Sequence, residues 1–280
     1  TTKDYVLEFE TDLENNLRHL QHELLLQTYR PQPLKTFILR DPKTRTISKS
    51  TFRDRLVHHA LCNIIEPFFE KNFIFDSYAN RRGKGTLKAV ERFDHFKGMV
   101  SRNNTRTCFV LKADIRKYFD NVDHHILLEI VTRKISDLRV LWLIETILAN
   151  YIKDDTSLFQ KGMPLGNLTS QFFANIYLNE LDQFVKHELK IKYYLRYVDD
   201  FVILHQSKDI LEEYQSKIEL FLRERLKLTL HPEKSIILIL DLGIPFLGFR
   251  LFSHHRLIQL KNMKKFYRKF VKLQELFKEG

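Results

Sequence analysis

The sequence is poor in cysteine, in glycine and proline, and in long apolar runs. Its two cysteines, Cys62 and Cys108, lie 46 residues apart among apolar neighbours, which fits buried thiols in a reducing compartment and offers no CxxC zinc pattern. The 8 glycines and 7 prolines argue against long disordered linkers. No apolar run approaches the ~20 residues of a membrane helix, and the first residues lack a signal-peptide pattern. We therefore expect a cytoplasmic protein without a membrane partner.

Positive charge is what the sequence has in excess. The 280 residues include 46 lysines and arginines against 35 acids, which gives a net charge of +11 and a pI near 9.5. A surface this basic attracts polyanions, so nucleic acid is the first candidate partner and an anionic membrane the second. Composition alone does not separate the two. The length suffices for one large unit or two packed subdomains.

Apolar periodicity predicts helices and short strands in a mixed order. Residues 11–14 resemble a capping box that opens a helix ending before Pro31. Further helices are predicted at 51–70, 87–100, 123–134, 137–151, about 172–185, 209–228 and from 261 onward. Strands are predicted at 37–39, 108–114, 192–198, 201–204, 235–240 and 246–252. Because hairpins are mixed among the alternating strands and helices, the fold class predicted is α+β.

Three aspartates are placed where apolar strands end. Asp114 closes one predicted strand, and Asp199 and Asp200 lie between two others that form a hairpin. If these strands are neighbours in one sheet, the carboxylates converge and need a cation, and hard oxygen ligands suit Mg²⁺. Two such ions can activate an attacking hydroxyl and stabilise a leaving phosphate oxygen. The alternative is that each aspartate merely caps a strand at the surface, which is common for a single aspartate.

The same residues resemble the motifs of a known family. The YVDD run at 197–200 resembles the YxDD signature of reverse transcriptases, and DIRKYFD at 114–120 resembles their first catalytic motif, 85 residues earlier. The resemblance extends from Tyr29 to about Phe252. It includes YRPQP at 29–33, RDPKTR at 40–45, SYANRRGKG at 77–85, KGMPLGNLTSQ at 161–171, HPEK at 231–234 and PFLGF at 245–249.

The resemblance implies a right-hand polymerase. Fingers would occupy 1–107 and the palm, an antiparallel sheet packed on helices, 108–249, with a helical fingers excursion near 136–160. Residues 250–280 would begin a thumb and are short for a complete one. Such an enzyme makes cDNA from an RNA template and uses dNTPs and a primer. Its family typically works with a small basic accessory protein.

Roles for the catalytic residues follow from the resemblance. Asp114 and Asp199 would be the main ligands of two Mg²⁺ ions, for which Mn²⁺ can substitute. Asp200 and the Ile115 carbonyl would support them. Lys234, in the motif after the catalytic hairpin, would protonate the pyrophosphate leaving group as general acid.

Substrate contacts are implied in the same way. Phe119 matches the ring that excludes the 2′-hydroxyl of a ribonucleotide, with a plain core aromatic as the alternative. Arg40 and Arg45 match residues that clasp the triphosphate, with solvated hairpin charges as the alternative. The remaining predicted contacts are Leu165, Gly166 and Gln171 for the nucleotide, Arg81, Arg82 and Lys84 for nucleic acid, and Phe246, Leu247 and Gly248 as a primer grip or a plain strand.

One motif narrows the subfamily. Most reverse transcriptases carry Gln-Gly and Ser-Pro where this chain has Leu165-Gly166 and Ser170-Gln171. This pattern resembles diversity-generating retroelements, whose enzyme copies a template RNA with frequent errors at adenines. A retron, group II intron-like or phage-defence reverse transcriptase is the alternative within the class. Outside it, a catalytically inactive palm that binds nucleic acid and a palm-fold nucleotide cyclase remain open.

Overall fold

The structure is a computed structural model of the chain, and it describes residues 3–40, 44–151 and 160–279. The chain forms two compact units. The helical unit comprises Thr1–Ile74, Arg116–Phe184 and Phe221–Thr229, and the sheet unit comprises Phe75–Ile115, Val185–Leu220 and Leu230–Gly280. Within the described ranges, no helix combines the length and the apolar character needed to cross a membrane.

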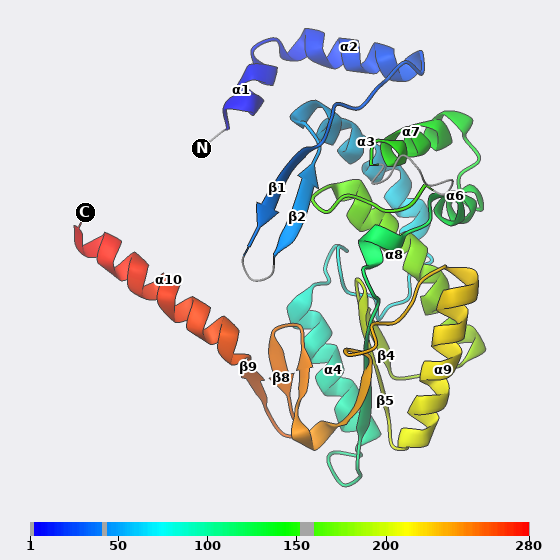
Figure 1. Cartoon of the computed structure of the whole chain (residues 1–280), viewed down its shortest axis with the longest axis vertical. Helices are drawn as coiled ribbons and strands as arrows, with labels where there is room; N and C mark the ends of the chain where they lie inside the picture. The colour runs from blue at the N-terminus through cyan, green and yellow to red at the C-terminus, as the bar shows by residue number, and fades with distance from the viewer. Residues whose placement is uncertain (1–2, 41–43, 152–159, 280) are drawn as a thin grey trace. The chain divides into compact units, whose positions relative to one another are not determined.

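The helical unit is built around α8 (Leu168–Gln183), which packs against α3 and α6 (Figure 1). Most of α8 is buried, because apolar side chains point to all of its sides; Phe172, for example, meets the ring of Phe69 edge-on at 5.9 Å. The other elements of this unit are α1 (Asp4–Glu10), α2 (Leu13–Leu25), α3 (Phe52–Glu70), α5 (Tyr118–Asn121), α6 (His124–Thr132), α7 (Leu138–Ala149) and the hairpin of β1 (Lys35–Leu39) and β2 (Arg45–Lys49).

The sheet unit contains a four-stranded antiparallel sheet in the order β4-β5-β3-β6. Its strands are β3 (Phe109–Asp114), β4 (Tyr194–Tyr197), β5 (Asp200–His205) and β6 (Ile236–Ile239). Helix α4 (Thr86–Val100) covers one face along β4 and β5 (Figure 1). Phe93 and Val90 of this helix belong to the same buried cluster as Val202 of β5. Consecutive side chains of β4 and β5 are buried, so both faces of these strands are covered.

A smaller sheet and a long helix follow in the sheet unit. The sheet has the order β7-β8-β9, with β7 (Ile244–Phe246), β8 (Phe249–Leu251) and β9 (Arg256–Ile258). Helix α10 (Leu260–Glu279) runs out from β9 (Figure 1) and carries lysines and one arginine beside exposed aromatic rings. Helix α9 (Lys208–Arg225) contributes residues to both units.

Two local predictions are wrong, and one short helix is not predicted by the sequence pattern. Thr11 does not open α2: its hydroxyl donates to the Leu7 carbonyl at 3.0 Å because Thr11 closes α1, a helix that the sequence pattern missed. Asp12 is the N-cap of α2 instead. The single strand predicted at 246–252 is a hairpin that turns at Leu247 and Gly248, both with positive φ. The RDPKTR stretch at 40–45 and the predicted excursion at 136–160 lie partly outside the described residues, and the fingers, palm and thumb boundaries stay a prediction.

Candidate active site

The large sheet brings the three predicted aspartates to one edge. Asp114, the last residue of β3, lies directly across from Asp200, the first residue of β5, in an antiparallel register. Asp199 occupies the turn before β5, where its carbonyl accepts a hydrogen bond from the Ile115 amide at 3.2 Å. The strand order therefore places carboxylates from two non-adjacent stretches of sequence side by side, as the apolar pattern predicts.

The carboxylates disturb one another electrostatically. The pKa of Asp200 is raised above its ordinary value, first by burial and then by the neighbouring Asp114 carboxylate. Lys112, whose ammonium lies 3.9 Å from Asp200, opposes this shift. Such an arrangement favours any cation that can share the two carboxylates.

The carboxylate oxygens at this end of the sheet are ligand atoms of the type that Mg²⁺ prefers. In the part of the chain that the structure describes, no three His, Cys, Asp or Glu side chains are gathered into a complete ligand set. Mg²⁺, however, is usually held by one or two carboxylates, with water and substrate phosphates completing its six positions. Asp114, Asp199 and Asp200 supply hard oxygen donors of that kind, so the residues present fit the ion.

Lys234 is held close to the aspartates by its own turn. The residues 231–234 form a turn after the bridge between Ile115 and Leu230, and the His231 amide donates to the Asp114 carbonyl at 2.7 Å. The Lys234 ammonium then lies 3.1 Å from Asp114 Oδ1, with 42% of its side chain exposed. A lysine in this position can both pair with the carboxylate and reach a substrate.

Arg196 supports the aspartate turn, and the sequence analysis missed it. Its side chain is completely buried and donates to the Val198 carbonyl at 3.0 Å. Val198 has φ +56, a left-handed conformation that is unfavourable for a β-branched residue. The available signal was an arginine inside an otherwise apolar strand, because a buried cation needs specific partners.

The cationic loop before α4 (residues 77–85) is folded against the β4–β5 hairpin. Ser77 pairs with Arg196 in a parallel bridge, and the Thr86 hydroxyl donates to the Tyr197 hydroxyl at 3.1 Å. Arg81 donates to the Ser77 carbonyl at 2.8 Å, and Lys84 donates to the Phe75 carbonyl at 2.7 Å. Arg81 and Lys84, both predicted to bind nucleic acid, thus also hold the loop in shape.

The remaining predicted contacts of the sheet unit differ in exposure. Arg82 of the cationic loop is exposed. In the predicted primer grip, Phe246 is buried against Phe93 at 6.0 Å between ring centroids. Leu247 and Gly248 form the tip of the β7–β8 hairpin, where a Cβ on Gly248 would lie 2.8 Å from Asn262 Nδ2.

The residues predicted to bind the nucleotide all belong to the helical unit. Arg40 and Arg45 are exposed at the far end of the β1–β2 hairpin, and Gln171 is exposed on the first turn of α8. Phe119 is half-buried on α5, 5.4 Å from the Tyr118 ring. Leu165 and Gly166 contact β2: the Leu165 carbonyl accepts the Ser48 amide at 2.9 Å. The structure therefore brings the hairpin and the 161–167 loop together.

An antiparallel sheet that presents paired carboxylates at a hairpin, with a lysine beside them, defines the palm of a nucleotidyl-transferring polymerase. The sequence profile described as reverse transcriptase (RNA-dependent DNA polymerase) matches residues 38–251. The chain belongs to the reverse transcriptase family and carries its RNA-directed DNA polymerase domain.

Relatives and solved structures agree with this family. Protein YkfC of Escherichia coli K12 is 30% identical over 274 residues, which cover 84% of this chain and 71% of YkfC. The group II intron-encoded protein LtrA of Lactococcus lactis is 25% identical over 303 residues, which cover 84% of this chain and 49% of LtrA. The chain thus spans about half the length of LtrA.

The fold is that of a right-hand polymerase. Apo telomerase from Candida tropicalis superposes with a TM-score of 0.61 at 11% identity, over 82% of this chain and 49% of that one. At this identity the likeness concerns the fold alone. The prediction of an α+β polymerase fold is confirmed, because both the helices and the antiparallel sheets are found.

Proposed function

We propose that this protein copies a template RNA into cDNA by two-metal nucleotidyl transfer at Asp114, Asp199 and Asp200. The observation that carries the proposal is the pairing of Asp114 with Asp200 across β3 and β5, with Asp199 in the adjoining turn. Asp114, Asp199 and the Ile115 carbonyl would hold the two Mg²⁺ ions, with Asp200 beside them. When bound, the ions supply activation of the primer hydroxyl and neutralisation of phosphate charge.

The chain's own groups serve proton transfer and orientation. Lys234 would move from Asp114 to the leaving pyrophosphate and donate a proton to it, a motion that its exposure allows. Arg196 would keep the Val198 carbonyl, and with it the turn of Asp199, in place before substrate arrives. Orientation fixed in advance lowers the cost of reaching the transition state.

RNA, a primer and dNTPs would be the partners of this site. The net charge of +11 suits a polyanionic template–primer, and LtrA is encoded by a group II intron. Arg40, Arg45 and Phe119 would contact the incoming dNTP, and Arg82 the nucleic acid backbone. A small basic accessory protein is part of the same proposal.

The subtype proposed is a diversity-generating reverse transcriptase that errs at template adenines. The support is Leu165-Gly166 together with Ser170-Gln171, where a leucine stands in place of a hydrogen-bonding glutamine. A pocket that selects mainly by shape discriminates less between right and wrong bases. The second candidate is a group II intron-like enzyme, which the similarity to LtrA favours.

Primer extension tests the proposal and separates the candidates. The protein would extend a DNA primer on an RNA template with Mg²⁺ or Mn²⁺, and the products would be sequenced. Extension with errors concentrated at adenines supports the diversity-generating subtype, and accurate extension supports the group II-like candidate. A folded protein that binds the template–primer without extending it would indicate an inactive palm, and the proposal would fail.

A further inference from the structure

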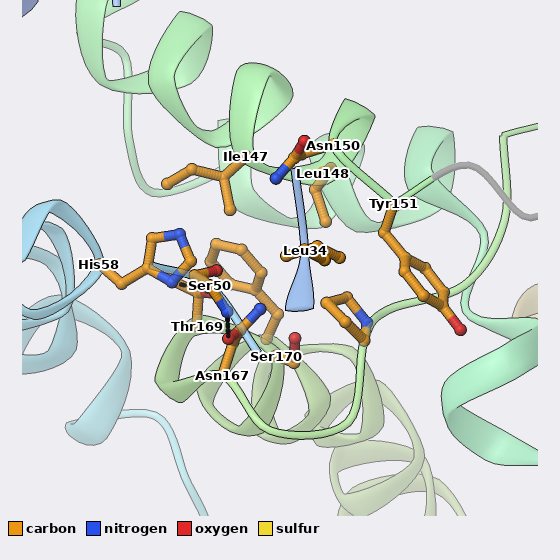
Figure 2. A pocket seen from close by; sticks show the side chains of 12 residues that line it. Leu34, Ser50, His58, Ile147, Leu148, Asn150, Tyr151, Asn167, Thr169 and Ser170 are labelled. Carbon is orange, nitrogen blue, oxygen red and sulfur yellow. Dashed lines mark hydrogen bonds between the residues drawn. The ribbon is translucent and has the colours of Figure 1, made fainter. Parts of the chain in front are cut away.

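The loop that precedes α8 is bonded to the base of the β1–β2 hairpin at two points. The Ser48 amide donates to the Leu165 carbonyl at 2.9 Å. The Ser50 amide donates to the Asn167 side-chain oxygen at 2.9 Å, the bond drawn as a dashed line in Figure 2. These contacts join stretches 117 residues apart in sequence. The second bond is the only one of the two that depends on a side chain.

Asn167 makes this bond at the expense of a local one. It is the N-cap of α8, where asparagine commonly accepts a hydrogen bond from its own helix. The first turn of α8, all of it described, receives no such bond from the Asn167 side chain. The side chain is buried and turned to Ser50 instead (Figure 2), so it acts between two segments.

Gly166 allows the loop to approach the hairpin closely. Its φ of +124 is open to glycine and strained for other residues. A Cβ there would lie 2.9 Å from Ile47 Cγ2, which is closer than real contacts. The loop backbone at Gly166 therefore lies directly against Ile47 and Ser48 of β2. The Asn167–Ser50 hydrogen bond follows one residue later in the loop.

The pocket beside the bond is too small for a ligand. It measures about 10 Å³, room for about one water molecule, and is lined by Ser50, His58, Asn167 and Ser170, among others (Figure 2). A nucleotide or metabolite would need a pocket of at least about 300 Å³. The buried polar groups here consequently serve the packing of the loop on the hairpin.

Most of the described part of the hairpin is exposed. All five residues of β1 are exposed, and in β2 only Ser48 is buried. Arg45 lies on the exposed part, four residues before Lys49, at the end of β2 that pairs with Leu39. The direction in which Arg40 and Arg45 point therefore depends on how the base at Ser48 and Ser50 is fixed.

We propose that Asn167 is a positioning residue for dNTP binding, which fixes the base of the β1–β2 hairpin and thereby the Arg45 side chain relative to Leu165. The inference rests on the proposed nucleotide contacts of Arg40, Arg45 and Leu165. Asn167 acts through the hairpin and does not itself touch the substrate. Removing its oxygen leaves the Ser50 amide buried without an acceptor and lets the hairpin move.

The test is steady-state primer extension with Asn167→Leu, which keeps the side-chain volume and removes the acceptor. The KM for dNTP should rise about three- to tenfold, the effect of one hydrogen bond. The kcat and the affinity for template–primer should change less than about twofold. Asn167→Asp, which keeps the acceptor and places a negative charge at a helix N-terminus, should restore the KM. A general loss of folding would instead lower kcat and template–primer affinity as well as raise the KM.

Two further variants keep the inference open to contradiction. Asn167→Ser caps α8 but is too short to reach Ser50, so it should fold and still show the raised KM if Asn167→Leu does not fold. Asn16→Ala removes an asparagine bond of 2.9 Å to the Phe9 carbonyl, far along the chain from the loop, and should leave the KM unchanged.

Arg45→Ala separates this inference from the proposed function. If Arg45→Ala raises the KM for dNTP and the Asn167 variants do not, the positioning role is wrong and the nucleotide site stands. If Arg45→Ala leaves the KM unchanged, the proposed nucleotide site is itself wrong. In the double variant Asn167→Leu/Arg45→Ala, the effect should be smaller than the product of the single effects, since both act through the same side chain. A KM increase in the double variant equal to the product of the two single increases would contradict the inference.

Discussion

The guanidinium of Arg196 donates a hydrogen bond of 3.0 Å to the carbonyl oxygen of Val198, one residue before Asp199 and Asp200, the proposed metal ligands. Arg196 is completely buried, and Val198 is in a left-handed conformation that costs about 1–3 kcal/mol. A buried cation thus stabilises a strained turn. The turn that carries the aspartates is held by a contact within the chain itself.

Replacing Arg196 by methionine should impair catalysis more than binding. The Val198 carbonyl would lose its donor, and the free energy of unfolding should fall by about 1–3 kcal/mol. The kcat of primer extension should fall about tenfold or more, because Asp199 would be less well placed. Arg223→Met, at an exposed position of α9, is the matched control. Unchanged kcat in a folded Arg196→Met protein would show that the turn needs no such support.

Phe119 should act as the steric gate of the nucleotide site. Its ring is half-buried beside Tyr118, so part of it faces outward from α5. Phe119→Ala should raise the ratio of ribonucleotide to deoxyribonucleotide kcat/KM by about tenfold or more, since the clash with the 2′-hydroxyl is removed. Competing rNTP and dNTP incorporation measures this ratio. If sugar selectivity stays the same in an active variant, Phe119 is only a packing residue.

Leu165→Gln should lower the error rate. The contact of Leu165 with Ser48 uses the backbone carbonyl, so the substitution leaves that bond in place. A glutamine could hydrogen-bond near the nascent base pair, and one such bond corresponds to roughly two- to tenfold in discrimination. The measurement is the number of errors per template base in sequenced products of the parent protein and of Leu165→Gln. An error-prone parent that Leu165→Gln leaves unchanged would place the source of infidelity elsewhere.

Stability should decrease on acidification because of His58. Burial lowers the pKa of His58 to about 4, although the Asp54 carboxylate opposes the shift. Between pH 6.5 and 4 the unfolded chain binds a proton that the folded chain excludes, so the free energy of unfolding falls as the pH falls. The loss can reach about 3 kcal/mol. Chemical denaturation at several pH values should show a flatter profile for His58→Gln but not for His59→Gln, at an exposed position.

Local sequence patterns predicted the elements and the carboxylate edge well. Apolar stretches before Asp114 and on both sides of Asp199 and Asp200 predict strands, and the structure pairs these strands in one antiparallel sheet. Thr11 was misassigned because its hydroxyl belongs to the end of α1, and a capping pattern does not show which helix it serves. The sequence predicts one strand across Leu247 and Gly248 because the residues directly before and after them, Phe246 and Phe249, are apolar.

The supporting residues could not be predicted in the same way. Asn167 and Arg196 matter through partners that only the folded chain brings near, such as Ser50, 117 residues away. An asparagine before a helix predicts a cap, and only the structure shows that its side chain is used elsewhere. Tertiary contacts of this kind leave no local periodicity in the sequence.

The central claim is that Asp114, Asp199 and Asp200 hold the catalytic metal ions, and primer extension on an RNA template with Mg²⁺ tests it most directly. Asp114→Asn and Asp199→Asn should each lower the extension rate by about a hundred- to a thousandfold, since each removes a charged ligand. Their melting temperatures should stay level or rise, because repulsion between the carboxylates is relieved. Asp209→Asn, at an exposed position of α9, should extend at the parent rate. An unimpaired rate in Asp114→Asn or Asp199→Asn would contradict the account.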